Sequence, residues 1–141
     1  MPHRSRLNFT KWTAMAVIIV ASTLASSDAV GQARPEPALR ETVTGMPRGE
    51  RQEVRVLTAT IKPGDKTVFH THRFPVTVYM LEGAFTLEME GRPPVTIKAG
   101  QAMVEPPNVK MTGHNRSATD SIRLVIFYVS DPETPFLDPV Q

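Results

Sequence analysis

The sequence predicts an all-β domain, built as a sandwich or barrel of short antiparallel strands. Between residues 53 and 129, short runs of β-branched and aromatic residues are separated by turn residues at a spacing of roughly 8–12 positions. Gly64, Gly83 and Gly100 are among the residues that end these runs. No segment after residue 34 repeats its apolar residues with a helical period over a useful length. One small domain made of strands is therefore expected.

The order of residue types in positions 1–33 is typical of a secretory signal peptide. A positively charged start that ends at Lys11 is followed by an apolar run, residues 12–25, and then by small residues with cleavage positions after Ala29 or Ala33. The apolar run is short for a hydrocarbon layer of about 30 Å. We therefore expect a periplasmic or secreted domain with no membrane span after cleavage. The alternative is an uncleaved N-terminal anchor.

The charge distribution argues against a nucleic-acid partner. The chain has 141 residues, with 16 Lys or Arg, 14 Asp or Glu and no Cys. Arg4, Arg6 and Lys11, set against the single acid Asp28, account for the whole excess of positive charge, so residues 34–141 are neutral and carry no basic stripe. The lack of Cys excludes disulfides, cysteine-ligated zinc and a thiolate nucleophile.

Behind the export segment, the chain divides into an arm, a strand-rich body and a tail. Residues 34–50 are rich in Pro, Gly and charge, which predicts a linker or an arm lying on a sheet. Residues 51–130 form the body, with strands expected at 54–59, 76–81, 84–89, 95–97 and 122–129. Residues 131–141 contain three prolines, so we expect an extended tail outside any strand ladder. Phe136 and Leu137 are available to pack on a neighbouring surface.

Two histidines, His70 and His72, are the first candidates for chemistry. Side chains at i and i+2 of a strand point to the same face, so both imidazoles are expected to lie a few ångströms apart. Imidazole is a ligand that suits Zn, Cu, Fe and Ni. The pair therefore indicates half of a metal site, and the alternative is two solvated histidines on an exposed strand.

The glycines around this pair extend the pattern to Gly64-x5-His70-x-His72-x10-Gly83. This spacing resembles the first motif of the cupin family, in which a Gly, a His-x-His pair, a Glu and a Gly follow one another. Gly100, Pro106 and Asn115 partly match the second cupin motif. The resemblance covers about residues 53–129. It implies that residues 51–130 form a small antiparallel β-barrel, a double-stranded β-helix or jelly roll, with its site at the mouth of the barrel.

The chain departs from the cupin motifs at three positions. The motif Glu would fall at Val76 or Thr77, so the resemblance supplies no carboxylate there. The second-motif Gly is Asn108, which tolerates a left-handed backbone and so preserves the turn. The second-motif His falls at Met111, and His114 follows three residues later. Of the ligands that cupins use, only His70 and His72 are aligned by the motifs.

Several ways of completing a metal site remain open. His114 becomes a third imidazole ligand if a bulge near Gly113 turns it inward, although strict alternation from Met111 points it outward. Met111 itself would give a site of two imidazoles and one thioether, which favours copper. Glu82 and Glu105 are nearby acids that could supply the carboxylate of a two-histidine, one-carboxylate triad.

A site without metal is the remaining interpretation of these residues. His70 and His72 would then form hydrogen bonds to a ligand in an apolar cavity. Met111 would belong to the wall of this cavity, since methionines on strands more often fill a core than bind a metal. The residues expected to line this pocket are Val76, Val78, Met80, Phe85 and Met111.

The function expected from the resemblance is that of an exported single-domain cupin with a pocket for a small organic molecule. A divalent transition metal (Zn, Fe, Mn, Ni or Cu) held by His70 and His72 would support dioxygenase- or isomerase-like chemistry. The alternative is a metal-free cupin that binds a small molecule or has a structural role. Cupins often dimerise and an open sheet edge invites pairing, so a homodimer is expected.

Overall fold

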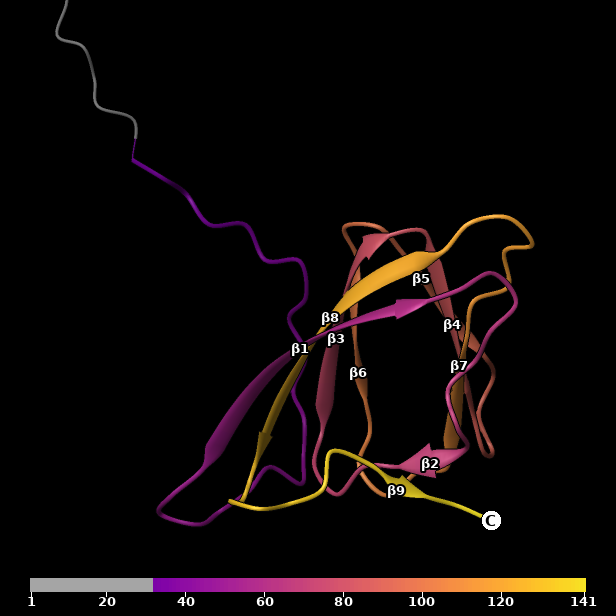
Figure 1. Ribbon diagram of the computed structural model, residues 1–141. Helices are drawn as coiled ribbons and strands as arrows, with labels where there is room; N and C mark the ends of the chain where they lie inside the picture. Colours follow the sequence, from indigo (N-terminus) through magenta and orange to yellow (C-terminus); the bar gives the residue numbers. More distant parts are fainter. Residues whose placement is uncertain (1–31) are drawn as a thin grey trace, which may run out of the picture. The chain divides into compact units, whose positions relative to one another are not determined.

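Strands with alternating burial form two antiparallel sheets that face each other (Figure 1). The computed structural model describes residues 32–141, which contain nine strands and no helix. The strands are β1 (Glu53–Ile61), β2 (His70–Thr71), β3 (Val76–Glu82), β4 (Ala84–Met89), β5 (Val95–Lys98), β6 (Ala102–Glu105), β7 (Met111–His114), β8 (Ile122–Ser130) and β9 (Asp138–Pro139). One sheet has the order β1-β8-β3-β6 and the other β5-β4-β7-β2-β9. The all-β prediction is confirmed.

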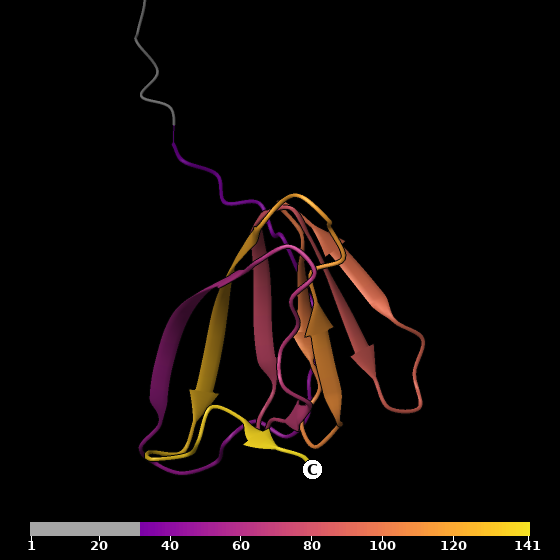
Figure 2. The same cartoon turned by 45° about the vertical axis from the view of Figure 1, so that its right-hand side comes forward.

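The predicted closed barrel is corrected to two separate sheets, an arrangement that fits a jelly roll. Within residues 32–141, no ladder joins a strand of one sheet to a strand of the other. Figure 2 shows the same two layers after a turn of 45°. The chain crosses between the sheets at tight turns, where Gly83 and Gly100 have φ angles of 78° and 83°. Strands end at these turns, so the ladders that would close a barrel are interrupted.

The hydrophobic core lies between the two sheets. On β3, Val76, Val78 and Met80 are buried while the residues between them are partly exposed, as the two-residue period of a strand requires. Burial of each such side chain contributes about 1.5–3 kcal/mol relative to leaving it exposed. The other members of the buried cluster are Phe85, Leu87, Ile97, Met103, Met111, Ile122, Leu124 and Tyr128. This core fixes the strands that carry the site described below.

The tail differs from its prediction, because it joins a ladder. In residues 131–141, β9 pairs with β2 and sets Asp138 opposite Thr71. Pro139 has no N–H group, which limits how far this ladder extends. Phe136 packs against the hydrophobic core, in agreement with the prediction that its side chain would find a neighbouring surface.

The predicted signal segment, residues 1–33, lies outside the described residues except for its last two positions. The chain divides into two units, residues 1–34 and residues 35–141, and all the strands named above belong to the second. Among residues 32–141, none belongs to a helix with the length and hydropathy needed to cross a membrane.

The outer face of the first sheet carries exposed apolar side chains. Val54 and Val56 of β1 are 68% and 59% exposed, and Phe127 of β8 is 44% exposed. Leu39 and Val43 of the arm line a hollow of about 300 Å³ on this face together with Phe127. The homodimer expected from the sequence stays a prediction, and this face is where we expect two copies to meet.

Replacing Gly83 by Ala is expected to destabilise the fold more than replacing Gly91, although their φ angles are similar at 78° and 73°. A Cβ atom on Gly83 would lie 2.5 Å from Ile122 Cγ2, whereas one on Gly91 meets nothing within 4 Å. The backbone penalty of about 1–2 kcal/mol is common to both variants. Overpacking against Ile122 adds about 1–3 kcal/mol for Gly83→Ala. Urea denaturation measures the difference, and equal free energies of unfolding would contradict the packing argument.

Candidate metal centre

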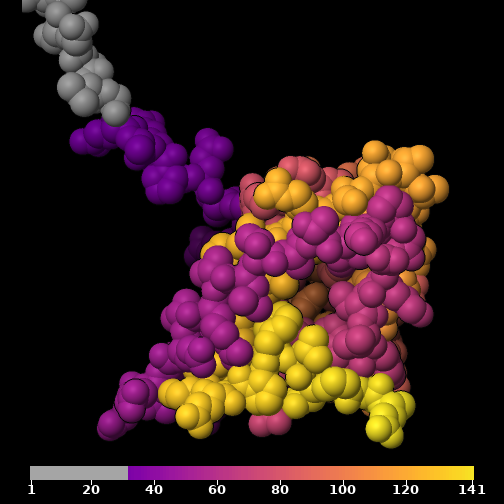
Figure 3. All heavy atoms as spheres, in the orientation of Figure 1, coloured from indigo at the N-terminus to yellow at the C-terminus, as the bar shows by residue number. Residues whose placement is uncertain are grey.

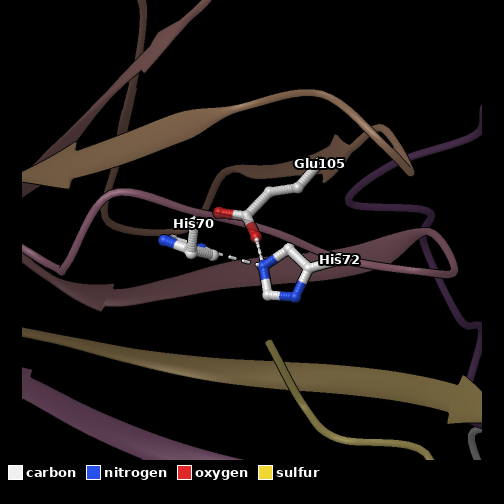
Figure 4. A group of neighbouring side chains, drawn as sticks. All are labelled: His70, His72 and Glu105. Atoms are coloured by element: carbon white, nitrogen blue, oxygen red, sulfur yellow. Dashed lines mark hydrogen bonds and ion pairs between the residues drawn. The ribbon is translucent and has the colours of Figure 1, made fainter. Parts of the chain in front are cut away.

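Strand β2 brings His70 and His72 together. His70 opens the strand and His72 follows its last residue, so both side chains point to the same side, as the i, i+2 spacing predicted. Their Nε2 atoms are 3.1 Å apart, and the rings meet edge to face with centroids 4.7 Å apart (Figure 4). Only 4% of His70 and 1% of His72 is exposed. The predicted pair is therefore a buried one.

Glu105, the last residue of β6, supplies a carboxylate to this pair. Its Oε2 atom lies 3.1 Å from Nε2 of His72, and the side chain is buried (Figure 4). The register of β3 and β6 sets Glu105 directly opposite Val76. Position 76 is one of the two places where the cupin motif would carry its Glu. The carboxylate thus reaches the same region of the sheet from the neighbouring strand.

Hydrogen bonds to backbone carbonyls fix the outer nitrogen of each imidazole. Nδ1 of His70 donates to the carbonyl of Val68 at 2.7 Å, and Nδ1 of His72 donates to the carbonyl of Phe136 at 2.6 Å. A carbonyl oxygen only accepts, so each Nδ1 atom carries a proton, and each ring, when neutral, presents a lone pair at Nε2. Such outer contacts are typical of histidines that bind metals.

With both rings neutral, three acceptors converge. They are Nε2 of His70, Nε2 of His72 and the carboxylate of Glu105, and their ligand atoms all lie within 4.8 Å of one another. A metal ion placed among these atoms would contact all three. Burial, opposed by the hydrogen bond to Val68, lowers the pKa of His70 and favours the neutral ring that a metal needs.

The separations fit a transition metal. Metal–ligand bonds of about 2.0–2.2 Å place neighbouring ligand atoms about 3.0–3.5 Å apart. The two contacts of His72 Nε2, to His70 Nε2 and to Glu105 Oε2, are both 3.1 Å. Two imidazoles and one carboxylate form the ligand set that leaves coordination positions open for other groups.

Of the other two predicted ligands, His114 lies apart from the three acceptors, whereas Met111 is a direct neighbour of His70. His114 is on β7, where its Nε2 atom is 3.3 Å from Oε2 of Glu88, and it is not part of the group of three acceptors. Strict alternation along the strand, which pointed His114 away from the site, explains this position. Met111 is fully buried in the hydrophobic core and is paired with His70 across β2 and β7.

A small cavity adjoins the candidate metal centre. Its volume is about 60 Å³, and it is lined by all three acceptor side chains together with Val78, Phe85 and Phe136, among others. Of the residues expected to line a pocket, Val78 and Phe85 are in this lining, and Val76 and Met80 are not. All four belong to the buried core.

Three arginines and the predicted acid Glu82 form ion pairs outside the cavity. Arg73 binds Asp138, Arg116 binds Glu88 and Arg123 binds Glu82, all near the surface. Glu82 therefore does not take part in the group of three acceptors. Within the described part of the chain, the lining of the small cavity includes no Lys or Arg. This cavity offers no cation to an anionic ligand.

Two asparagines of the second motif support the site from outside. Asn108 has a φ of 60°, which confirms the left-handed turn expected where the cupin motif has Gly. Its N–H donates to the carbonyl of His72 at 2.7 Å. Asn115 is buried and its side-chain amide donates to the carbonyls of Ile61, Lys62 and Asp120. Both residues therefore hold loops in place and lie outside the candidate ligand set.

One of two sequence comparisons finds a match for this chain. A family model described as a cupin domain matches residues 57–128. None of the curated proteins matches the chain.

Solved structures share the fold. A cupin-like protein from Thermotoga maritima has a TM-score of 0.54 at 18% identity, covering 62% of this chain and 64% of that chain. A conserved protein with a double-stranded beta-helix domain from Klebsiella pneumoniae has a TM-score of 0.54 at 16% identity, covering 78% of this chain and 99% of that chain. A structure of DMSP lyases has a TM-score of 0.54 at 17% sequence identity, covering 62% of this chain and 44% of that chain. The chain thus spans less than two thirds of the first and third of these proteins.

Replacing Glu105 by Gln is expected to leave the metal-free protein as stable or more stable by about 1 kcal/mol. The amide N–H can donate to Nε2 of His72, so a convergence of acceptors becomes a neutral hydrogen bond. The same change should weaken metal binding, because an amide is a poorer ligand than a carboxylate. Chemical denaturation with chelator present measures the stability. A large loss of stability would show instead that a charged His72–Glu105 ion pair stabilises the metal-free fold.

Proposed function

This chain belongs to the cupin domain family, and from that membership we propose that it is a metal-dependent cupin whose ion is held by His70, His72 and Glu105. The observation that carries the proposal is the convergence of three buried acceptors, two of them oriented by backbone carbonyls. Among Zn, Fe, Mn, Ni and Cu, a ligand set of two histidines and one carboxylate favours Fe(II).

The residues of the chain have separate tasks in this proposal. His70 and His72 hold the ion through Nε2, and Glu105 balances part of its charge. The apolar side chains of Val78 and Phe85 exclude water from the adjoining cavity. When bound, the metal supplies Lewis-acid or oxygen-activating chemistry at its open positions. The substrate class that fits is a small organic molecule, because the cavity is small.

The solved structures support an enzymatic function for this chain only by their shared fold. One of the solved structures with this fold is of DMSP lyases, so the architecture carries an enzyme in that case. At 17% identity the likeness does not extend to the substrate. Dioxygenase- or isomerase-like activity of this chain is therefore a proposal that rests on its own three acceptors. The competing proposal, a metal-free pocket, is separated from it by the metal titration below.

Metal titration is expected to give one bound ion per chain in untagged protein. His70→Ala and His72→Ala should each weaken the affinity by more than about 100-fold, since loss of an outer hydrogen bond to a ligand already costs about 10–100-fold. Calorimetry with Zn²⁺, Mn²⁺, Ni²⁺ and anaerobic Fe²⁺ measures the affinities. A parallel titration of Met111→Leu with Cu⁺ tests the thioether interpretation.

His114→Ala is the matched control for this titration. It removes an imidazole of the same domain that is paired with Glu88 outside the three acceptors, so the affinity should not change. A loss as large as that of His72→Ala would make His114 a ligand and would reject the assignment of Glu105. If the native protein binds none of these ions, the metal-free pocket is the better proposal.

We also propose that the domain works outside the cytoplasm, as a periplasmic or secreted protein. The support is the order of positive, apolar and small residues in positions 1–33. N-terminal sequencing of protein recovered from the periplasm or the medium should begin after Ala29 or Ala33. A cytoplasmic product that retains Met1 would reject export.

A further inference from the structure

The last eight residues, 134–141, cross the cavity beside the candidate metal centre, and we call them the C-terminal strap. In Figure 3, the yellow C-terminal segment covers the lower part of the face, next to a hollow. The side chains of Phe136 and Leu137 line the cavity. The ring of Phe136 lies 4.9 Å from that of His72, measured between centroids. The strap therefore forms one wall of the site.

The strap also provides the acceptor that orients His72. Nδ1 of His72 donates to the backbone carbonyl of Phe136 at 2.6 Å, across 64 positions of the sequence. The other histidine, His70, uses the carbonyl of Val68, which is only two residues away and belongs to the body of the domain. The imidazole of His72 thus takes its orienting acceptor from the strap, whereas that of His70 does not.

Polar contacts at both ends fasten the strap. Near its start, Nη2 of Arg55 donates to the carbonyl of Thr134 at 2.7 Å. Near its end, the carboxylate of Asp138 accepts two hydrogen bonds from Arg73, at 2.8 and 2.9 Å. The guanidinium of Arg73 lowers the pKa of Asp138 by this hydrogen bonding, so the pair is ionised at neutral pH. These contacts place Phe136 and Leu137 over the cavity.

The same contacts allow the strap to detach. The side chains of Arg73 and Asp138 are 54% and 38% exposed, and exposed ion pairs stabilise little. Strand β9 has only two residues, one of which is Pro139. Segments with few buried contacts and exposed polar anchors open more readily than the core of a domain. Lifting the strap does not require β1, β3 or β8 to separate.

We infer that the C-terminal strap gates the cavity and that Phe136 is a positioning residue for His72; this inference rests on the metal-binding function proposed above. The cavity of about 60 Å³ is small beside the roughly 300–1,000 Å³ of typical ligand pockets, and Phe136 and Leu137 form part of its wall. Movement of these two side chains away from the cavity would make room for a larger ligand. The same movement releases the carbonyl that orients His72, so opening the site loosens the metal.

The first test compares two exposed Arg–carboxylate pairs, only one of which is on the strap. Asp138→Asn weakens the strap anchor at Arg73, and Glu82→Gln weakens the matched pair with Arg123 at the far end of β3. The probe is Zn²⁺ alone, whose release to excess chelator is followed in time. Asp138→Asn should release the ion about 10-fold faster than the native protein. Glu82→Gln should leave the rate unchanged. Equal rates in all three proteins would overturn the inference.

A spectroscopic readout separates positioning from general loss of stability. Imidazole ¹⁵N shifts of the metal-free protein should show His72 protonated at Nδ1, because of its bond to Phe136. In Asp138→Asn this signature should shift toward a mixture of tautomers, while that of His70 stays as it is. A merely destabilising change would move both histidines or neither, and that result would count against Phe136 as a positioning residue.

A reversible lock tests the gate directly. Residues 71 and 138 are direct partners in the pairing of β2 with β9, and the chain has no Cys, so Thr71→Cys with Asp138→Cys creates one thiol pair. Oxidation of this pair should slow the release of Mn²⁺ about 10-fold relative to the reduced form of the same protein. Mn²⁺ is the probe here because the reduced thiols would themselves bind Zn²⁺. Equal rates in the two forms would overturn the gate. If the native chain binds no Zn²⁺ or other tested ion, the proposed function fails first.

Discussion

Two hydrogen bonds that point away from the candidate metal centre determine what it can bind. His70 and His72 each give their Nδ1 proton to a backbone carbonyl, which leaves both Nε2 atoms as acceptors. Adding the carboxylate of Glu105 creates a buried group that repels itself unless a cation is present. The apolar walls of the cavity strengthen the repulsion among these acceptors, because charge is screened less in an apolar environment than in water. The direction in which both Nε2 atoms point thus follows from contacts on the far side of each ring.

The strand register explains how the site keeps a carboxylate although the cupin motif lacks its Glu. Val76 occupies one of the motif positions on β3, and Glu105 on β6 is its direct partner across the ladder. Residues opposite each other in an antiparallel pair have their Cβ atoms about 4.5–5.5 Å apart and point to the same face. A carboxylate can therefore move to the neighbouring strand and still reach His72. In this chain the carboxylate is therefore carried by β6 and not by β3.

The strap links the chemistry of the site to its access. Its contacts with Arg55 and Arg73 hold Phe136 in place. The backbone carbonyl of Phe136 accepts a hydrogen bond from His72, and its side chain forms part of the cavity wall. The body of the domain is held by a buried core between two sheets, whereas the strap is held by a short ladder, one exposed ion pair and the partly buried contacts of Arg55 and Phe136. This difference in local stability favours motion at the strap over motion of the long strands.

The sequence alone determined the all-β class, the long strands and the pair His70–His72, because alternation, turn glycines and an i, i+2 spacing are local properties. It also indicated the left-handed turn at Asn108. Tertiary structure decided that the sheets stay separate, that Glu105 is the third acceptor while His114 turns to Glu88, and that the tail pairs with β2. Strands β6, β7 and β9 are only two to four residues long, too short for a period to predict them. Which residues meet across sheets depends on register, and register is set by the whole fold.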